Sequence, residues 1–98
     1  MNKYVLKLFI TGQTPRSTYA VANLNRICHD ALNDQCEVLI IDVLEHPELA
    51  EEDKILATPT LIKASPPPAR RVIGDLSDMQ KVVWGLGLYQ RLDDTGNR

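Results

Sequence analysis

The sequence predicts a single α/β domain with a central mixed β-sheet, spanning residues 1–98. Two apolar, β-rich segments, 4–10 and 38–43, flank an amphipathic segment over 15–32. Short links between such segments predict two parallel strands joined by a right-handed helical crossover. Two further strand-like segments and a last helical pattern follow. A chain of 98 residues is long enough for one modest core and too short for two.

The first strand and the first helix carry the clearest patterns. Residues 4–10 have little polar interruption, which predicts an inner strand covered on both faces. Thr14 and Pro15 suit an N-cap and a first helical position. The apolar residues after them recur at helical spacing. They are Ala20, Val21, Leu24, Ile27, Cys28, Ala31 and Leu32.

The remaining elements alternate between helix and strand patterns. Residues 38–43 predict a second buried strand, and 47–54 a short helix with proline at its start and carboxylates in its first turns. The far end of residues 55–63, where Pro59 restricts how early a ladder can begin, predicts a further strand. Residues 70–73 predict the strand that pairs with it as a hairpin around a proline-rich turn.

The last helix is expected to begin with a capping box. Ser77 and Gln80 stand three residues apart, as that motif requires. Its expected buried stripe includes Leu86 and Tyr89, after Met79, Val82 and Val83. Gly85 and Gly87 are expected inside this helix, where each costs about 1 kcal/mol relative to alanine.

This order of elements is the thioredoxin topology, and we expect a three-layer domain with helices on both faces of the sheet. In thioredoxins, the loop after the first inner strand carries a Cys-x-x-Cys pair at a helix start. Here that loop, residues 11–17, holds no cysteine, which argues against dithiol exchange. Thr58-Pro59-Thr60 stands where thioredoxin-like proteins place a cis-proline before the third strand.

The two cysteines do not form a disulfide framework. We expect Cys28 to be a core residue and Cys36 to lack a neighbouring base, with both thiols free in a reducing cytoplasm. A thiol oxidoreductase that uses Cys28 or Cys36 is the enzymatic alternative. The favoured hypothesis is a protein-binding module that is not an enzyme.

Composition excludes other classes of function. The formal net charge of −2 does not favour nucleic acid as a partner, and no apolar run could span a bilayer. Neither His29 nor His46 shows metal-ligand spacing with a cysteine or a carboxylate, and no glycine-rich phosphate motif is present. We therefore expect no metal site and no cofactor.

The C-terminal half combines helix-weakening glycines with isomerisable peptide bonds. Pro66, Pro67 and Pro68 give three bonds that can each isomerise over tens of seconds or longer. Together with Gly85 and Gly87, they predict a metastable half that is able to adopt a second arrangement.

Several long stretches of the chain resemble the KaiB family of circadian clock proteins. The most specific is Leu49-Ala50-Glu51-Glu52-Asp53-Lys54-Ile55-Leu56-Ala57-Thr58-Pro59-Thr60-Leu61. The others are Tyr4–Leu8, Gly12–Pro15, Ile41–Leu44 and Pro66–Ser77, so that the resemblance spans nearly the whole chain.

This resemblance implies a non-enzymatic regulator with two folds. The ground state of the family is commonly a homotetramer, and we expect a tetramer or dimer here, with its second half rearranged after about Lys54. A rarer thioredoxin-like monomer binds the ring of a KaiC-type ATPase and, in organisms that have KaiA, sequesters KaiA so that KaiC loses its activator. The alternatives are a stress-response role and a sensor domain of the kind found at the N-terminus of a clock-output histidine kinase.

The resemblance also indicates which residues bind a partner and which influence the choice between the two folds. Lys54, Lys63, Arg70 and Arg71 are similar to basic positions near the KaiC contact or the tetramer surface. Pro59, the three prolines 66–68 and the two glycines are the expected fold-switch positions. Gly85 matches a glycine that influences fold choice in the family, whereas Gly87 departs from the aspartate common in cyanobacterial members.

Overall fold

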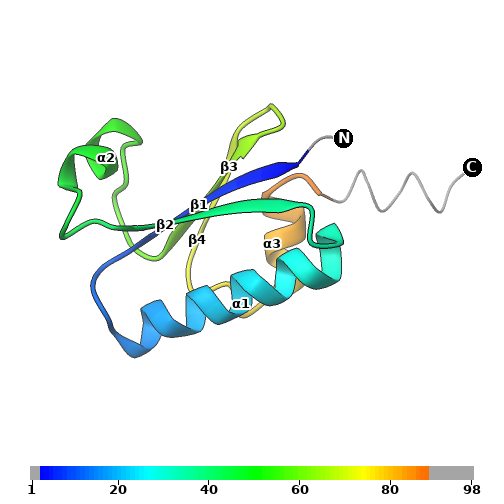
Figure 1. Cartoon of the computed structure of the whole chain (residues 1–98), viewed down its shortest axis with the longest axis horizontal. Coiled ribbons are helices and arrows are strands. Elements are labelled where there is room, and N and C mark those ends of the chain that lie inside the picture. Colours follow the sequence, from blue (N-terminus) through cyan, green and yellow to red (C-terminus); the bar gives the residue numbers. More distant parts are fainter. Residues whose placement is uncertain (1–2, 89–98) are drawn as a thin grey trace, which may run out of the picture.

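A four-stranded mixed sheet forms the centre of the fold (Figure 1). The fold is known from a computed structural model, which describes residues 3–88. The strands are β1 (Tyr4–Ile10), β2 (Cys36–Asp42), β3 (Thr60–Ser65) and β4 (Arg70–Ile73), in the order β2-β1-β3-β4. β1 is parallel to β2 and antiparallel to β3, and β3 is antiparallel to β4. The predicted parallel pair and the predicted hairpin are confirmed.

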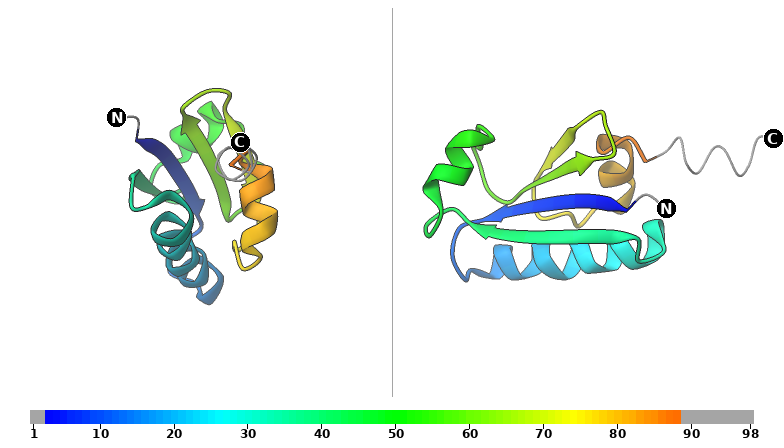
Figure 2. Two further views of the ribbon diagram at one scale, coloured as in Figure 1. Left: turned by 90° about the vertical axis from the view of Figure 1, so that its right-hand side faces the viewer. Right: turned by 45° about the horizontal axis from the view of Figure 1, so that its top comes forward.

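Two helices cover one face of this sheet. They are α1 (Pro15–Leu32) and α3 (Met79–Gly85), which lie on the same side of the strands (Figure 2). The short helix α2 (Pro47–Glu52) lies at the end of the sheet, beyond β2. As predicted, Thr14 caps α1, because its Oγ1 accepts a hydrogen bond from the backbone N–H of Ser17 at 3.1 Å.

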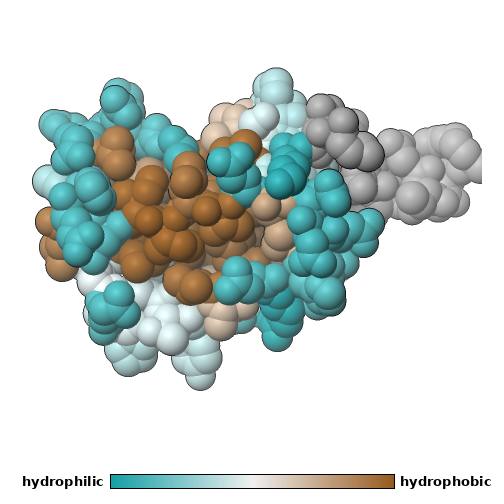
Figure 3. Space-filling view, viewed as in Figure 1, coloured by the Kyte–Doolittle hydropathy of each residue, from teal (hydrophilic) through white to brown (hydrophobic). Residues whose placement is uncertain are grey.

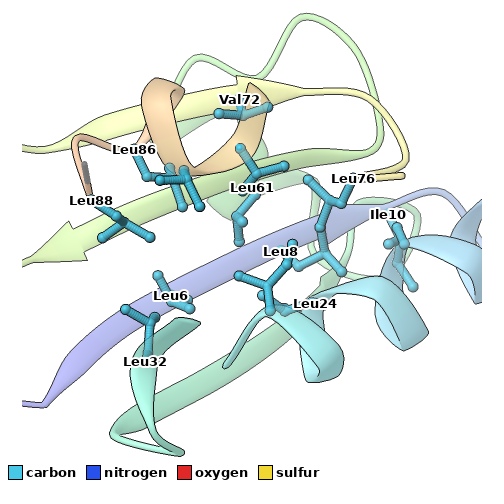
Figure 4. Packing of buried hydrophobic residues seen from close by; sticks show 14 residues of the cluster. Leu6, Leu8, Ile10, Leu24, Leu32, Leu61, Val72, Leu76, Leu86 and Leu88 are labelled. Carbon is cyan, nitrogen blue, oxygen red and sulfur yellow. The ribbon is translucent and has the colours of Figure 1, made fainter. Parts of the chain in front are cut away.

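The main core lies between the sheet and these two helices. Figure 4 shows Leu6 and Leu8 of β1 pointing toward Leu32 and Leu24 of α1. All four are at most 1% exposed. Burial of one such side chain is worth about 1.5–3 kcal/mol, so this layer fixes α1 against β1.

Strand β2 is an edge strand and not the buried strand that its apolar sequence predicts. It pairs with β1 alone, and none of its seven residues is buried. Leu39 and Ile40 are each 44% exposed. An apolar run predicts a strand but does not show whether helices cover it. Here α1 covers one face of β2 only in part, and α2 lies beyond the end of the sheet rather than over the other face.

The two cysteines are joined in a disulfide rather than free. Cys28 in α1 pairs with Cys36, the first residue of β2, and their Cα atoms are 6.2 Å apart. Asn33 and Asp34 have φ angles of 53° and 61°, which reverse the chain after α1. This tight turn brings Cys36 back beside Cys28, and periodicity along the sequence could not show it.

Helix α3 begins one residue later than the capping box predicted. The N-cap is Asp78, whose Oδ1 accepts from the backbone N–H of Lys81 at 3.2 Å. The backbone N–H of Ser77 donates to Oδ1 of Asp75 at 3.0 Å instead. Ser77 therefore belongs to the preceding turn, and the predicted pairing with Gln80 is wrong.

Gly87 ends α3 and is not inside it. It follows the C-cap Leu86 at a φ of +77°, a left-handed conformation that glycine adopts without steric cost. Its N–H donates to the carbonyl of Trp84 at 3.1 Å, and the N–H of Leu88 donates to that of Val83 at 2.8 Å. These two bonds define a Schellman motif, which satisfies the last carbonyls of the helix. Tyr89, predicted to join the buried stripe, lies outside the described residues.

We predict that Gly87→Ala destabilises this fold by about 1 kcal/mol, because alanine is strained at a positive φ. For a chain of this size, the melting temperature should fall by about 4–8 °C. Gly87→Asn is the control, since asparagine tolerates this conformation better. Thermal unfolding followed by circular dichroism measures both, and equal melting temperatures for Gly87→Ala and the parent chain would contradict the prediction.

Candidate protein-binding site

The loop that carries the redox dithiol in thioredoxins carries a threonine hydroxyl here. Thr11 follows β1, and its Oγ1 lies 2.6 Å from Oγ1 of Thr58, so one of the two hydroxyls donates a hydrogen bond to the other. The Thr58–Pro59 peptide bond is cis, as expected, and Pro59 is buried. A small cavity of about 240 Å³ beside the two threonines is otherwise lined by apolar side chains. This geometry offers neither a thiol nor an acid–base pair.

Two of the predicted basic residues meet at the end of α2, on the sheet face opposite α1 and α3. Arg71 donates from Nη2 to the carbonyl of Asp53 at 2.8 Å and from Nη1 to the carbonyl of Lys54 at 3.3 Å. The Asp53 carboxylate in turn pairs with Nζ of Lys7 at 2.6 Å. Lys7 and Arg71 lie in one row across the sheet, because both are in register with Ile62. We name these four residues, Lys7, Asp53, Lys54 and Arg71, the α2 junction.

The other two predicted basic residues lie on the opposite face. Lys63 is in register with Leu6 on one side and with Arg70 on the other, so it points toward the helix-covered face. Lys63 is 5% exposed, whereas Arg70 is exposed. Burial lowers the pKa of Lys63 below its usual value, and the charge of Arg70 lowers it further. The sheet thus separates the four predicted residues into two pairs.

The predicted fold-switch residues surround β4. Pro66, Pro67 and Pro68 form the turn between β3 and β4, and the Ser65–Pro66 and Pro67–Pro68 bonds are cis. Gly85 lies at the end of α3 against Val72 of β4, where a Cβ atom would overlap Cγ2 of Val72. Glycine therefore lets α3 approach β4 closely.

An exposed apolar surface lies along the free edge of the sheet. Figure 3 shows apolar side chains gathered over β2 and bordered by polar ones. The exposed members are Leu39, Ile40 and, just after the strand, Leu44, which is 68% exposed. A groove of about 450 Å³ between α1 and Ile40 borders this surface. Sequence reasoning missed it, because the same residues were assigned to a buried strand. We name Leu39, Ile40 and Leu44 the β2 edge.

Within residues 3–88, no helix combines the length and the apolar character needed to cross a membrane. Over the same range, no three histidine, cysteine or acidic side chains gather as metal ligands.

Comparison with solved structures agrees with this geometry. The N-terminal domain of SasA from Synechococcus elongatus superposes with a TM-score of 0.73 at 25% identity, over 92% of this chain and 87% of that one. Mitochondrial thioredoxin 3 from Saccharomyces cerevisiae gives a TM-score of 0.69 at 17% identity, over 89% and 79% of the two chains. The fold and the sulfur-free loop therefore define a thioredoxin-like protein without the thioredoxin dithiol.

Comparison by sequence is more specific. The KaiB domain model matches residues 7–88. The circadian clock protein KaiB3 of Synechocystis sp. is 57% identical over 99 residues, covering 96% of this chain and 97% of the relative. The circadian clock oscillator protein KaiB of Acaryochloris marina is 53% identical over 92 residues, covering 93% and 88%. This chain belongs to the KaiB family of circadian clock proteins.

We predict that Lys63→Met raises the melting temperature at neutral pH, because burial of the Lys63 side chain partly desolvates its charged ammonium. The pKa of Lys63 is lower in the folded chain than in the unfolded chain, so the unfolded chain binds more protons between these two pKa values. The cost of burying the charge is therefore full below the folded pKa and disappears as the pH rises to the unfolded value of about 10.4.

Thermal unfolding of the parent and Lys63→Met at pH 7 and at pH 10 tests this. The difference in melting temperature should shrink at the higher pH. Lys3→Met serves as the control, since it makes the same substitution at an exposed position just before β1. An unchanged difference at pH 10 would show that the buried charge is not the cause.

Proposed function

We propose that this chain is a non-enzymatic clock regulator that binds the ring of a KaiC-type ATPase and antagonises its autophosphorylation. In a system that contains KaiA, the complex sequesters KaiA. Membership of the KaiB family supports this proposal. The paired threonine hydroxyls at the thioredoxin redox position support a role that does not depend on dithiol exchange.

The observation that carries the proposal is the β2 edge. Leu39 and Ile40 point to opposite faces of the same strand, and both are 44% exposed. Soluble proteins usually protect an edge strand with charges, prolines or a covering element. An apolar edge that remains open is suited to a protein partner, which can cover the side chains and pair with the free backbone groups.

The four predicted basic residues lie outside the β2 edge and differ in accessibility. The side chains of Lys54 and Arg70 are exposed and available to an acidic partner surface, and Arg70 lies on β4, at the opposite edge of the sheet from β2. Arg71 is exposed too, but its guanidinium already holds two backbone carbonyls. Lys63 is buried in this arrangement, so a role in partner binding would need the second arrangement.

We propose that the thioredoxin-like fold described above is the arrangement that binds the ATPase, and that a tetramer or dimer with a rearranged second half is its resting form. Several contacts join residues before Lys54 to residues after it. Nδ2 of Asn23 donates to the carbonyl of Asp75 at 2.8 Å, and Thr11 contacts Thr58 at 2.6 Å. Repacking of the second half breaks such contacts, so they favour the binding arrangement.

Two alternatives have less support. The likeness to the SasA N-terminal domain is compatible with an adaptor or sensor module, but its identity of 25% is far below that of the KaiB relatives. A thiol oxidoreductase is disfavoured, because Cys36 and Cys28 lie at the opposite end of α1 from the loop at Thr11. A bacterial cytoplasm is the proposed location, and a stress role in a system without KaiA remains within the proposal.

The test mixes the chain with the KaiC-type ATPase of its own organism and follows assembly over hours by size-exclusion chromatography with light scattering. Slow assembly from a free oligomer is the expected result. Fast assembly from a monomer would keep the partner but contradict the resting form. Absence of a complex would overturn the proposed function.

We predict that Ile40→Asp weakens this complex by at least about tenfold, since it places a charge in the apolar β2 edge. Ile73→Asp is the matched control, because Ile73 is 55% exposed and lies on β4, the opposite edge of the sheet. Binding titrations measure both variants, and circular dichroism verifies that they are folded. Equal losses for the two variants would contradict a role for β2.

We also predict that Asn23→Ala weakens ATPase binding by about two- to fivefold. The variant removes the hydrogen bond from Nδ2 of Asn23 to the carbonyl of Asp75, a contact worth about 0.5–1 kcal/mol that joins the two halves of the chain in the binding arrangement. Gln80→Ala is the control, because it truncates an exposed amide side chain on α3. Unchanged affinity for Asn23→Ala would show that this contact does not set the fold balance.

A further inference from the structure

Two sulfur atoms meet at the end of α1, outside the surfaces described above. Cys28 and Cys36 are the only cysteines of the sequence, so they form the only disulfide possible within one chain. Their Cα atoms are 6.2 Å apart, within the range that disulfides bridge without movement of the backbone. We propose that this pair is a reversible redox staple, which closes and opens with the surrounding thiol–disulfide balance and stabilises the turn into β2 when closed.

The turn keeps its shape by other contacts, so the fold does not depend on the disulfide. The N–H of Asp34 donates to the carbonyl of Cys28 at 2.9 Å, and that of Gln35 to Leu32 at 2.9 Å. The N–H of Tyr4 donates to the carbonyl of Gln35 at 2.8 Å and ties the turn to β1. The sulfurs are therefore held near each other when they are reduced, which favours closure.

The turn between α1 and β2 also contains backbone conformations of higher energy, which a disulfide across the turn would stabilise. Asn33 and Asp34 both have positive φ angles, which non-glycine residues rarely adopt in succession. Closing the disulfide restricts the unfolded chain between residues 28 and 36 and so favours the folded turn. Because Cys36 is the first residue of β2, the closed form also fixes the start of this edge strand.

The position of the pair suits a structural link better than an oxidoreductase. Catalytic thiols gain reactivity at helix N-termini, whereas Cys28 lies in the C-terminal part of α1, where the helix dipole disfavours a thiolate. Cys28 is 9% exposed, and Cys36 is more accessible. Cys36 is therefore the sulfur that meets an external reagent first.

Glutathione disulfide is a sufficient oxidant. The Cys36 thiolate attacks one of its sulfurs, which forms a mixed disulfide and releases one glutathione thiolate. The Cys28 thiolate then attacks Sγ of Cys36, which forms the bond between the two cysteines and releases the second glutathione. The chain loses two electrons and two protons, and one glutathione disulfide becomes two glutathione thiols. Excess reduced glutathione reverses both steps.

The experiment equilibrates the full chain in glutathione buffers from fully reduced to fully oxidised, followed by alkylation and intact-mass measurement. We expect the covalent mass of a single chain throughout, with two alkylated cysteines from the reduced buffer, none from the oxidised buffer, and reversible conversion between these two forms. The oxidised form should melt about 10–20 °C higher than the reduced form. Cys36→Ser, which keeps the size of the side chain, should melt at one temperature in both buffers.

Three outcomes would overturn the proposal. They are two alkylated cysteines in every buffer, a disulfide only between two chains, and a closed disulfide with an unchanged melting temperature. Cys28→Ala serves as a second variant in case Cys36→Ser fails to fold. ATPase binding is not the readout, so failure of the staple and failure of the proposed function are distinguishable.

Discussion

Strand β1 is the element on which the rest of the structure depends. It is hydrogen-bonded to β2 on one side and to β3 on the other, so both halves of the chain are attached through it. Its alternating side chains serve two purposes. Leu6 and Leu8 anchor α1 and α3 in the main core, while Lys7 and Phe9 point to the other face. Phe9 is fully buried there, and Lys7 anchors the end of α2 through Asp53.

Regular elements that bury one stripe of side chains could be predicted from the sequence. The cap at Thr14 and the helical spacing up to Leu32 define α1, and its boundaries agree with the structure. The lack of dithiol chemistry in the loop after β1 could also be predicted, because the sequence shows directly that residues 11–17 contain no cysteine. The expected cis bond before Pro59 is also present.

Features that depend on neighbours in space could not be predicted. The apolar run of β2 is the same for a covered and an uncovered strand, so the exposure of Leu39 required knowledge of which face of the sheet the helices cover. The disulfide depends on the positive φ angles of the turn before Cys36. Lys63 and Arg71 are separated because alternation along paired strands sends them to opposite faces of the sheet.

The contacts of Arg71 have a consequence for how the chain tolerates sequence change. Its guanidinium holds the carbonyls of Asp53 and Lys54, which every residue type carries. The contact does not depend on the side chain at position 54, but Lys54 has a φ of 55°, so the backbone there favours residues that tolerate the left-handed conformation. Arg71 is constrained through its side chain instead, because lysine lacks the planar guanidinium that donates to two adjacent carbonyls. Position 54 is thus restricted by its backbone conformation and position 71 by the chemistry of its side chain.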